Sequence, residues 1–355
     1  MRISRKMEHI RHALKLGQSG EQGMSDIAFV PNALPEAHLD GISLHTRIGE
    51  LAMSSPILIN AMTGGAPETE AINRELAVAA RETGIAMAVG SQMAAIRNPD
   101  LAASYRVVRS VNPDGLVFGN LGGEATVDEA MRAVEMLRAD ALQIHLNAMQ
   151  ELIMPEGDRD FRGRLERIQA IAESLPVPVI VKEVGFGIAR ESVERLWRAG
   201  IRIVDVGGAG GTNFAAIENA RREAPLAWLN DWGCKTSVAL LEALDARSRL
   251  DRPERLTLIA SGGMRSGLDV CKALALGASA AGMAGALLQA LRSEGTAALI
   301  DKIREIHDEM RLVMTALGAS SVSALQRTPL VVSGESAQWC EARGIPISAF
   351  AQRKG

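Results

Sequence analysis

The amino-acid sequence predicts an α/β fold, a (β/α)8 TIM barrel with an N-terminal extension, on three observations. Short β-like runs alternate with helical patterns eight times between residues 57 and 285. Several runs are apolar throughout, as expected for parallel strands covered on both faces. Glycine follows nearly every run, which is typical of a whole ring of ligand-facing loops. A doubly wound sheet is the structural alternative, but it usually has fewer units and one Gly-rich turn.

Each expected strand is a short apolar run that ends at glycine or a polar residue. The eight runs are 57–61, 85–91, 116–122, 141–147, 177–184, 202–208, 256–263 and 278–285. Helical patterns follow them, for example at 102–111 and 164–174, and the last helices run to about residue 317. Residues 1–56 precede the barrel, and the tail after residue 317 is predicted to be irregular. Because no linker composition separates a second unit, we expect residues 1–355 to form one domain.

Composition excludes several classes of function. Lys and Arg number 39 against 42 Asp and Glu, so the net charge of −3 offers no basic field for nucleic acid. Six Phe, one Tyr and four Trp are too few for base stacking.

Cys234, Cys271 and Cys340 lie far apart, which argues against a zinc site or disulfides and fits a reducing, cytoplasmic compartment. The charged N-terminus does not resemble a signal peptide, and no run of about 18 uncharged apolar residues predicts a membrane span.

Two Gly-rich turns near the end of the expected barrel indicate a phosphate site. LIASGGMRSGLDVCKAL reads as a strand, a Gly-Gly turn and a helix start, and SAAGMAGALLQAL repeats the pattern one unit later. Backbone N–H groups at a helix N-terminus bind phosphate, and barrels often hold one between the loops after strands seven and eight. The alternative is that these glycines only permit tight turns. We expect a phosphate-bearing cofactor here.

Polar side chains at the expected strand ends indicate where the chemistry lies. His145 and Asn147 stand two apart in an extended run and therefore face the same side, and Gln150 and Glu151 follow them. One carboxylate cannot hold a metal alone, but Mg²⁺ typically takes one or two carboxylates together with phosphate oxygens. Lys182 stands within the apolar run VPVIVKEV, where a buried charge needs a partner or a role. The alternative for His145 is a core histidine bonded to backbone.

Other patterns point to no further chemistry. Composition alone favours a solvated terminus for Arg5 and Lys6. The chain has no Gly-x-Ser-x-Gly elbow, H-E-x-x-H motif or Walker A loop, so hydrolase and kinase functions have no support.

Taken together, a series of motifs resembles one known family. The motifs, in chain order, are SRKMEHI, ILINAMTGG, AVGSQM, GNLG, QIHLNAMQE, MPEGDRDF, VPVIVKEVGFG, VDVGGAGGTNF, NDWG, IASGGM and GMAG, and the resemblance runs from about Ser4 to Trp339. They resemble the type II isopentenyl-diphosphate isomerases, the FMN-dependent isomerases of isoprenoid biosynthesis. SGGM occurs in other flavin barrels, whereas QIHLN followed by QE, together with MPEGDR, is much more specific.

The resemblance implies a TIM barrel that binds FMN, Mg²⁺ and isopentenyl or dimethylallyl diphosphate. It assigns to FMN the residues Ala61, Met62, Thr63, Ser91, Asn120, Lys182, Gly207, Thr212, Gly263, Met264, Arg265, Ala284 and Gly285. It assigns to the substrate Arg5, Lys6, Ser91, His145, Asn147 and Gln150, and to Mg²⁺ Glu151. Some members carry an Arg soon after GSQ that reaches the diphosphate; this chain has Met93 there, with Arg97 nearby.

The resemblance also implies a mechanism in which reduced FMN acts as acid and base, with NADPH as the reductant. We expect Lys182 to stabilise negative charge on the reduced flavin and Gln150 to orient the substrate or relay a proton. The face of Trp232 would stabilise positive charge on the substrate, with plain apolar packing as the alternative. Cys234 follows NDWG and is expected near the site.

Two other functions stay open at this point. One is an FMN-dependent oxidoreductase of the 2-hydroxy acid dehydrogenase type, and the other is a non-catalytic flavin-binding sensor or scaffold. The QE pair with Arg5 and Lys6 argues against the sensor, which needs no shell for a diphosphate and a metal. We expect a homo-oligomer without nucleic-acid or membrane partners.

Overall fold

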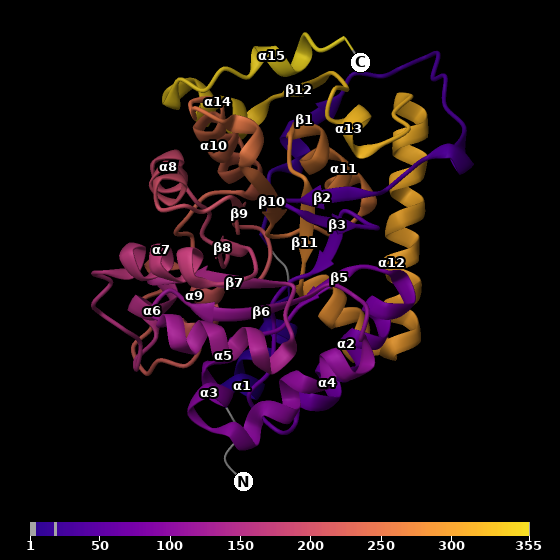
Figure 1. Cartoon of the computed structure of the whole chain (residues 1–355). Helices are drawn as coiled ribbons and strands as arrows, with labels where there is room; N and C mark the ends of the chain where they lie inside the picture. The colour runs from indigo at the N-terminus through magenta and orange to yellow at the C-terminus, as the bar shows by residue number, and fades with distance from the viewer. Residues whose placement is uncertain (1–4, 18–19, 355) are drawn as a thin grey trace.

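The computed structural model describes residues 5–17 and 20–354. Eight parallel strands close into a barrel in chain order from β4 to β11, and β11 pairs back onto β4 (Figure 1). The strands are β4 (Ile57–Ile59), β5 (Ala86–Ala88), β6 (Val117–Gly122), β7 (Ala141–Leu146), β8 (Val179–Glu183), β9 (Ile203–Asp205), β10 (Thr257–Ser261) and β11 (Ala280–Met283). The predicted fold class is confirmed.

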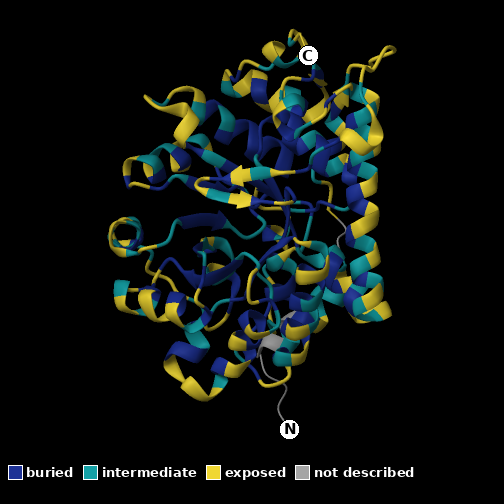
Figure 2. Cartoon of the chain, turned by 45° about the vertical axis from the view of Figure 1, so that its right-hand side comes forward, coloured by how far each residue is buried: buried dark blue, intermediate teal, exposed yellow. Residues whose placement is uncertain are grey.

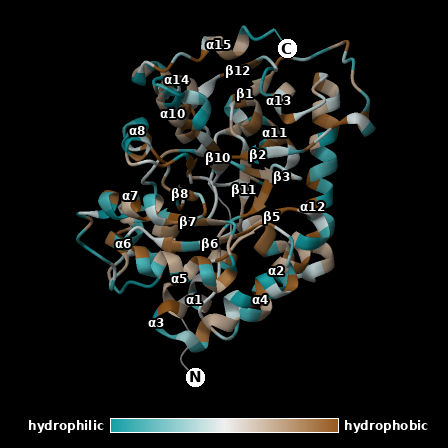
Figure 3. Cartoon of the chain, viewed as in Figure 1, coloured by the Kyte–Doolittle hydropathy of each residue, from teal (hydrophilic) through white to brown (hydrophobic). Residues whose placement is uncertain are grey.

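Helices surround the barrel, and those that pack against the strands, such as α2 on β5 and α5 on β6, bury an apolar face there. In α2, for example, Ile72 and Leu76 stand four apart and are buried. Figure 2 shows buried strands in the centre and exposed outer helix faces, and Figure 3 shows hydrophilic residues on those outer faces. The helices are α1 (Arg5–Leu16), α2 (Thr69–Thr83), α3 (Met93–Arg97), α4 (Ala103–Val111), α5 (Val127–Leu137), α6 (Ala148–Ile153), α7 (Arg164–Ser174), α8 (Arg190–Arg198), α9 (Phe214–Asn219), α10 (Thr236–Ser248), α11 (Gly267–Leu276) and α12 (Gly285–Leu317).

Most strands end earlier than the sequence predicts. We expected 202–208, but β9 covers only Ile203–Asp205. Gly207 has a φ of +48°, in the left-handed region, so an extended strand cannot continue through it. The glycines and polar residues that we placed at strand ends therefore lie mainly in the loops beyond them.

The amino-terminal end of the barrel is closed by a hairpin from the N-terminal extension. Strands β2 (Thr46–Ile48) and β3 (Leu51–Met53) form this antiparallel pair. Ile48 and Met53 are buried in one cluster with the inward-facing residues of the barrel, among them Phe118. The hydroxyl of Thr46 donates to the carbonyl of Ser279 at 2.8 Å, which ties the hairpin to the loop before β11. Apolar side chains thus fill this end.

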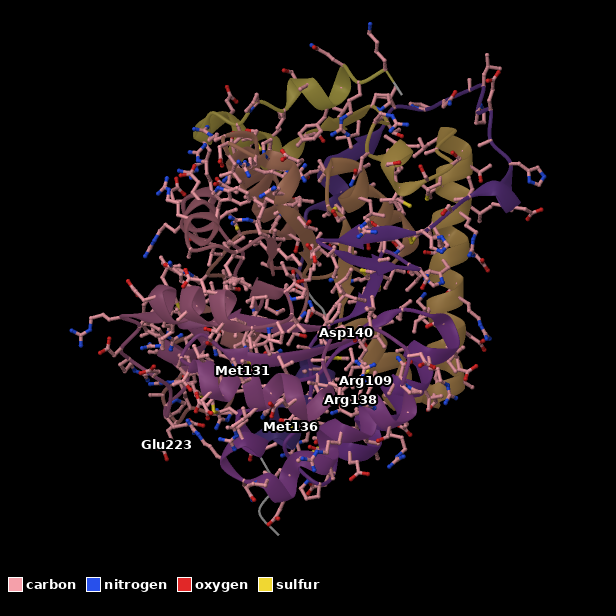
Figure 4. All side chains as sticks on the ribbon, viewed as in Figure 1. Arg109, Met131, Met136, Arg138, Asp140 and Glu223 are labelled. Atoms are coloured by element: carbon pink, nitrogen blue, oxygen red, sulfur yellow. The ribbon has the colours of Figure 1, made fainter. Side chains whose placement is uncertain are left out.

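A buried arginine joins the segments that precede β6 and β7. The Arg109 guanidinium, from α4, donates to Oδ2 of Asp140 at 2.7 Å and to the carbonyl of Arg138 at 2.8 Å (Figure 4). It also donates to the carbonyls of Leu137, Asn112, Pro113 and Gly115. These carbonyls stand at the end of α5 or in the segments that follow α4 and α5, where no strand partner satisfies them, so one side chain stabilises both connections.

The C-terminal tail is regular, and the prediction of an irregular tail is wrong. Strand β12 (Leu330–Val332) pairs antiparallel with β1 (Ile27–Phe29) of the extension. Helices α13 (Val322–Leu325), α14 (Gly334–Arg343) and α15 (Ser348–Ala351) accompany it. These elements are short and β12 depends on a distant partner strand, so local sequence carries little signal for them. The assignment of residues 1–355 to one domain stays a prediction.

Within residues 5–17 and 20–354, no helix combines the length and apolar character needed to span a bilayer.

Candidate active site

A cavity of about 490 Å³ lies at the carboxyl ends of the barrel strands. This volume falls within the range of small-molecule and cofactor sites. Residues that follow all eight strands line it, together with Ile10, Ala13 and Leu14 of α1. The predicted site residues among its walls are Ala61, Met62, Ser91, Asn120, His145, Asn147, Gln150, Glu151, Lys182, Gly207, Thr212, Gly263, Met264, Ala284 and Gly285.

Thr63, Arg265 and Trp232 were predicted but are not among these walls, and two further predicted residues have side chains outside the described part of the chain. The side chains of Arg5 and Lys6 lie outside the described residues, although the backbone of both belongs to α1. Thr63 is buried, and its Oγ1 has no hydrogen-bond partner in the described part of the chain. The Arg265 guanidinium donates to the carbonyls of Gly20 and Gly210. Trp232 is 56% exposed, so its placement supports no contact with substrate, and its catalytic role stays an untested prediction.

Backbone packs directly on backbone where the loops after β8, β9 and β10 meet. A Cβ on Gly207 would lie 2.1 Å from the carbonyl oxygen of Glu183. A Cβ on Gly262 would lie 2.0 Å from the carbonyl oxygen of Gly208, and Gly262 also has a φ of +112°. Only glycine fits at these two positions, and the wall it makes exposes peptide groups in place of side chains.

The two expected phosphate-binding helix starts differ in the structure. The N-terminus of α11 is capped by its own side chains, because Ser266 and Asp269 form a capping box. The N-terminus of α12 has Ala284 at the capping position, which supplies no side-chain hydrogen bond, and both Ala284 and Gly285 line the cavity. The first turn of α12 is therefore the helix start that can donate N–H groups to a ligand.

Lys182 stands on the cavity floor, on β8. It is 6% exposed, and its Nζ donates to the carbonyl of Glu183 at 2.7 Å. Its register partners are His145 on β7 and Asp205 on β9. The charge of Lys182 thus lies in the cavity wall, on the strand next to the one that carries the buried Asp205.

Glu183 is a strand-end residue whose environment only the structure defines. Its Oε2 accepts hydrogen bonds from the backbone N–H groups of Val184, Gly185 and Phe186 at 2.5, 2.9 and 2.7 Å. Burial outweighs these bonds and raises the pKa of the Glu183 carboxyl to about 7. A group with this pKa changes protonation near neutral pH.

His145 is oriented by a neighbouring amide. Its Nδ1 lies 2.8 Å from Oδ1 of Asn120, and since an amide oxygen only accepts, Nδ1 is the donor. The backbone N–H of Asn120 in turn donates to Oε1 of Gln92, whose side chain is fully buried. The alternative was a core histidine bonded to backbone, but this hydrogen bond joins His145 to a side chain.

Helix α6 brings the predicted polar cluster together. Nδ2 of Asn147 donates to Oε1 of Glu151 at 2.9 Å, and Nε2 of Gln150 donates to Oε1 of Glu218 at 2.9 Å. Glu218 lies on α9, is fully buried and pairs with Arg221. Sequence reasoning missed Glu218, which stands 68 residues from Gln150 in an ordinary helical pattern.

The MPEGDRDF segment holds the carboxylate predicted to bind Mg²⁺. The backbone N–H of Asp158 donates to Oε2 of Glu151 at 2.8 Å, and Arg159 donates to the carbonyls of Glu151 and Met154. The described chain contains no group of three or more His, Cys, Asp or Glu side chains that could hold a metal ion. A cation here would therefore need oxygens from a substrate as further ligands.

Comparison with known proteins identifies the family. The sequence model described as FMN-dependent dehydrogenase matches residues 117–332. An isopentenyl-diphosphate delta-isomerase from Geobacillus sp. (strain WCH70) is 50% identical over 353 residues, which are 99% of each chain. A protein of the same name from Bacillus cytotoxicus is 51% identical over 353 residues, again 99% of each chain. The chain belongs to the isopentenyl-diphosphate delta-isomerases. The match to the FMN-dependent model places it in their type II class.

Solved structures of other flavoenzymes share the barrel of this isomerase family. A mandelate oxidase structure with an FMN adduct superposes with a TM-score of 0.62 at 19% identity and covers 92% of each chain. A flavocytochrome b2 structure with benzoylformate gives a TM-score of 0.66 at 18% identity, over 91% of this chain and 78% of that one. At such identities the likeness shows the fold alone.

The cavity of this family member fits FMN, the cofactor of its class. The wall around Gly207 and Gly262 admits a ligand against bare backbone, and the open first turn of α12 suits a phosphate. Lys182 supplies a buried positive charge to the same cavity. Peptide groups and one cation therefore form the shell that a flavin with a phosphate requires.

Met93, at the position where the family resemblance led us to look for a diphosphate-binding Arg, is the first residue of α3. Arg97 stands four residues later on the same helix, and both side chains line the cavity. Residues four apart on a helix lie on one face. Arg97 is exposed, and the structure gives its side chain no hydrogen bond or ion pair with any residue it describes.

Proposed function

We propose that this protein converts isopentenyl diphosphate to dimethylallyl diphosphate with FMN bound in the cavity. The observation that carries the proposal is one continuous cavity with two kinds of wall. One wall is glycine backbone and the start of α12, and the other is the cluster of Asn147, Gln150 and Glu151. The first wall suits a flavin phosphate, and the second suits a substrate that brings its own phosphates and a cation.

The reaction moves a double bond by adding a proton at one carbon and removing a proton from another. An isolated alkene is a poor base, so the transfer needs a strong acid in a pocket without bulk water. Reduced FMN, when bound, supplies this acid and base chemistry. The chain's own residues bind, orient and exclude water around it.

We infer distinct tasks for two side chains in this chemistry. Lys182 favours negative charge on a reduced flavin, because it is a cation with little exposure on the cavity floor. Gln150 hardly titrates, so we infer that its amide orients the substrate while Glu218 holds it in place. Lys182→Ala should weaken FMN binding or activity, as measured by flavin titration and turnover. Retention of both would remove that role.

The substrate diphosphate requires cations that outweigh the carboxylates of the cavity. In the described part of the chain, Glu124, Glu151 and Glu183 line it with only Arg97 and Lys182 as cationic side chains. Lys182 already donates to a strand carbonyl. We infer that Arg97 binds the diphosphate in place of an Arg at position 93, together with Arg5, Lys6 and an Mg²⁺ ion on Glu151.

Other features of the proposal concern the setting of the reaction. The net isomerisation is redox-neutral, so NADPH would serve only to reduce the flavin beforehand.

Cys234, Cys271 and Cys340 are free thiols, which supports a cytoplasmic location. Trp228 is 77% exposed and Trp232 is 56% exposed, and such large apolar surfaces support a homo-oligomer.

Turnover under anaerobic conditions tests the proposal. FMN-loaded protein is reduced once, isopentenyl diphosphate and Mg²⁺ are added, and dimethylallyl diphosphate is measured per flavin. Many products per reduction are expected. No dimethylallyl diphosphate would contradict the proposal. In that case, reduction of oxidised FMN by a 2-hydroxy acid would indicate an oxidoreductase of the 2-hydroxy acid dehydrogenase type, and the lack of either reaction would indicate a flavin-binding sensor or scaffold.

A further inference from the structure

A buried carboxylate accepts hydrogen bonds from three groups of the cavity wall. Asp205, the last residue of β9, has no exposed surface and is not part of the cavity wall. Its Oδ2 accepts from Nδ2 of Asn60 at 2.7 Å. Its Oδ1 accepts from the hydroxyl of Ser261 at 2.5 Å and from the backbone N–H of Gly207 at 3.3 Å. Asn60, Ser261 and Gly207 all line the cavity.

These contacts join four strands across the barrel. Asn60 follows β4, Ser261 ends β10, and Asp205 ends β9, the neighbour of β10. Oδ1 of Asn60 also accepts from Nε2 of Gln143 on β7 at 3.1 Å and from the backbone N–H of Ala61 at 2.9 Å. Asp205 is therefore the central acceptor of a polar layer that separates the cavity from the apolar interior.

The charge of this carboxylate is not matched by a close cation. In the described part of the chain no salt bridge includes Asp205, and its three close partners are an amide, a hydroxyl and a backbone N–H. All three partners can donate, so neither oxygen needs a proton to complete its contacts. Its register partner on β8 is Lys182, whose ammonium donates elsewhere, to the carbonyl of Glu183. The two opposite charges thus stand on neighbouring strands, and no salt bridge joins them.

We propose that Asp205 is a positioning residue for the flavin, and that its charge sets how readily the bound flavin is reduced. It fixes Asn60, Ser261 and Gly207 in the geometry that the cofactor meets. Its negative charge opposes the added charge of reduction, whereas Lys182 favours it. The inference rests on FMN occupying this cavity, as proposed above.

The test compares FMN affinity and flavin midpoint potential in the wild type and in Asp205→Asn. The substitution keeps the shape but removes the charge and one acceptor. We expect the dissociation constant of oxidised FMN to rise about tenfold. We expect the preference for reduced over oxidised FMN to increase about tenfold, which corresponds to a midpoint potential about 30 mV higher for a two-electron couple. An unchanged potential would overturn the proposal.

A matched control separates charge from general loss of stability. Asp245 on α10 is also buried, at 5% exposure, and pairs with Arg190 and Arg249 away from the cavity wall. Asp245→Asn should lower the free energy of unfolding but leave the flavin potential unchanged. An equal shift of potential in this control would overturn the proposal.

A second variant keeps the proposal falsifiable if Asp205→Asn does not fold. Ser261→Ala removes one donor but leaves the carboxylate in place, so the less stabilised negative charge should lower the potential. A potential that stays the same or rises would contradict the proposal. All these measurements omit isopentenyl diphosphate, and wild-type turnover is measured separately. A wild type that isomerises while the Asp205→Asn potential stays constant would refute the role of Asp205 alone.

Discussion

The two ends of the barrel are built in opposite ways. At the amino-terminal end, Ile48 and Met53 from the β2–β3 hairpin fill the interior, and Arg109 satisfies the carbonyls of two turns. At the carboxyl end, Gly207 and Gly262 bring backbone against backbone, and a cavity of about 490 Å³ remains. Side chains close the first end, whereas their absence keeps the second end open.

This difference separates stability from function along each strand. Buried apolar and charge-paired side chains at the amino end stabilise the fold without facing a ligand. The carboxyl end places charged groups such as Lys182 and Glu183 in a poorly solvated wall, which costs stability unless a ligand or hydrogen bonds compensate. Substitutions at the two ends should therefore change different measured quantities.

The largest expected effect comes from a glycine at the carboxyl end of β9. Gly207→Ala would place Cβ 2.1 Å from the carbonyl oxygen of Glu183, at a φ of +48°. We expect the free energy of unfolding to fall by about 3 kcal/mol or more, and FMN affinity to fall by at least about tenfold. Urea unfolding and flavin titration measure both.

A glycine near the other end of the same strand is the control. Gly200 also has a positive φ, of +85°, but a Cβ there would meet no atom within 4 Å. Gly200→Ala should cost only about 1 kcal/mol of backbone strain, with FMN affinity unchanged. Equal effects of the two substitutions would remove the distinction between the ends.

The next largest effect is expected at the amino end. Arg109→Met removes the cation that pairs with the Asp140 carboxylate, which keeps the backbone N–H of Val117 as a donor, and leaves several carbonyls without the Arg109 donor. We expect the free energy of unfolding to fall by about 3 kcal/mol, measured by urea unfolding. FMN affinity should change less than about twofold, since this cluster is remote from the cavity wall. A large loss of FMN affinity in folded protein would show that the two ends are coupled.

A smaller effect is expected at the mouth of the cavity. Arg97→Ala removes a cationic side chain from the wall, and we expect KM for isopentenyl diphosphate to rise about tenfold, or about 1.4 kcal/mol. FMN affinity should stay the same. Arg106→Ala, an exposed arginine on α4 outside the cavity wall, serves as the control. A normal KM in Arg97→Ala would show that other cations bind the diphosphate.

The smallest expected effect concerns pH. Burial raises the pKa of Glu183 from its usual value near 4.5 to about 7, so the folded state holds this proton more tightly than the unfolded chain. The contribution of this carboxyl to the free energy of unfolding is fully present below about pH 4.5 and is lost as pH rises through 7. Because the Glu183 carboxyl keeps some exposure, we expect the free energy of unfolding to fall by only about 1 kcal/mol as pH rises across this window.

Glu183→Gln should flatten this part of the pH profile, because the amide still accepts the three N–H bonds but does not titrate. Urea unfolding at several pH values between 4.5 and 7.5 measures the change. An identical pH profile in the variant would assign the titration to another group.

Much of the fold followed from local pattern. The eight apolar runs all became barrel strands, and helix α7 has the predicted bounds of 164–174. The predicted strands extend too far at their carboxyl ends, because a glycine that ends a strand also fits the apolar pattern of that strand. The tail was missed because β12 gains its hydrogen bonds from β1, about 300 residues away.

Some residues of the candidate site could also be predicted from local sequence, and others could not. Lys182, His145 and Gln150 could be selected because a polar residue at the end of an apolar run is a local signal. Glu218 and Asp205 gave a weaker signal, since their roles depend on partners 68 and 145 residues away. Trp232 was selected from its motif, but the structure places it outside the cavity wall.

The order of short apolar runs, helices and glycine turns was sufficient to specify eight β/α units, since periodicity and turn chemistry act within a few residues. Motif content was sufficient to indicate the flavin isomerase family. Only the closed barrel decided which end is filled and which is open, and which partners Asp205, Glu218 and Arg97 have or lack. Those outcomes depend on packing between segments far apart in the chain, where burial and hydrogen-bond geometry exist only after the strands have met.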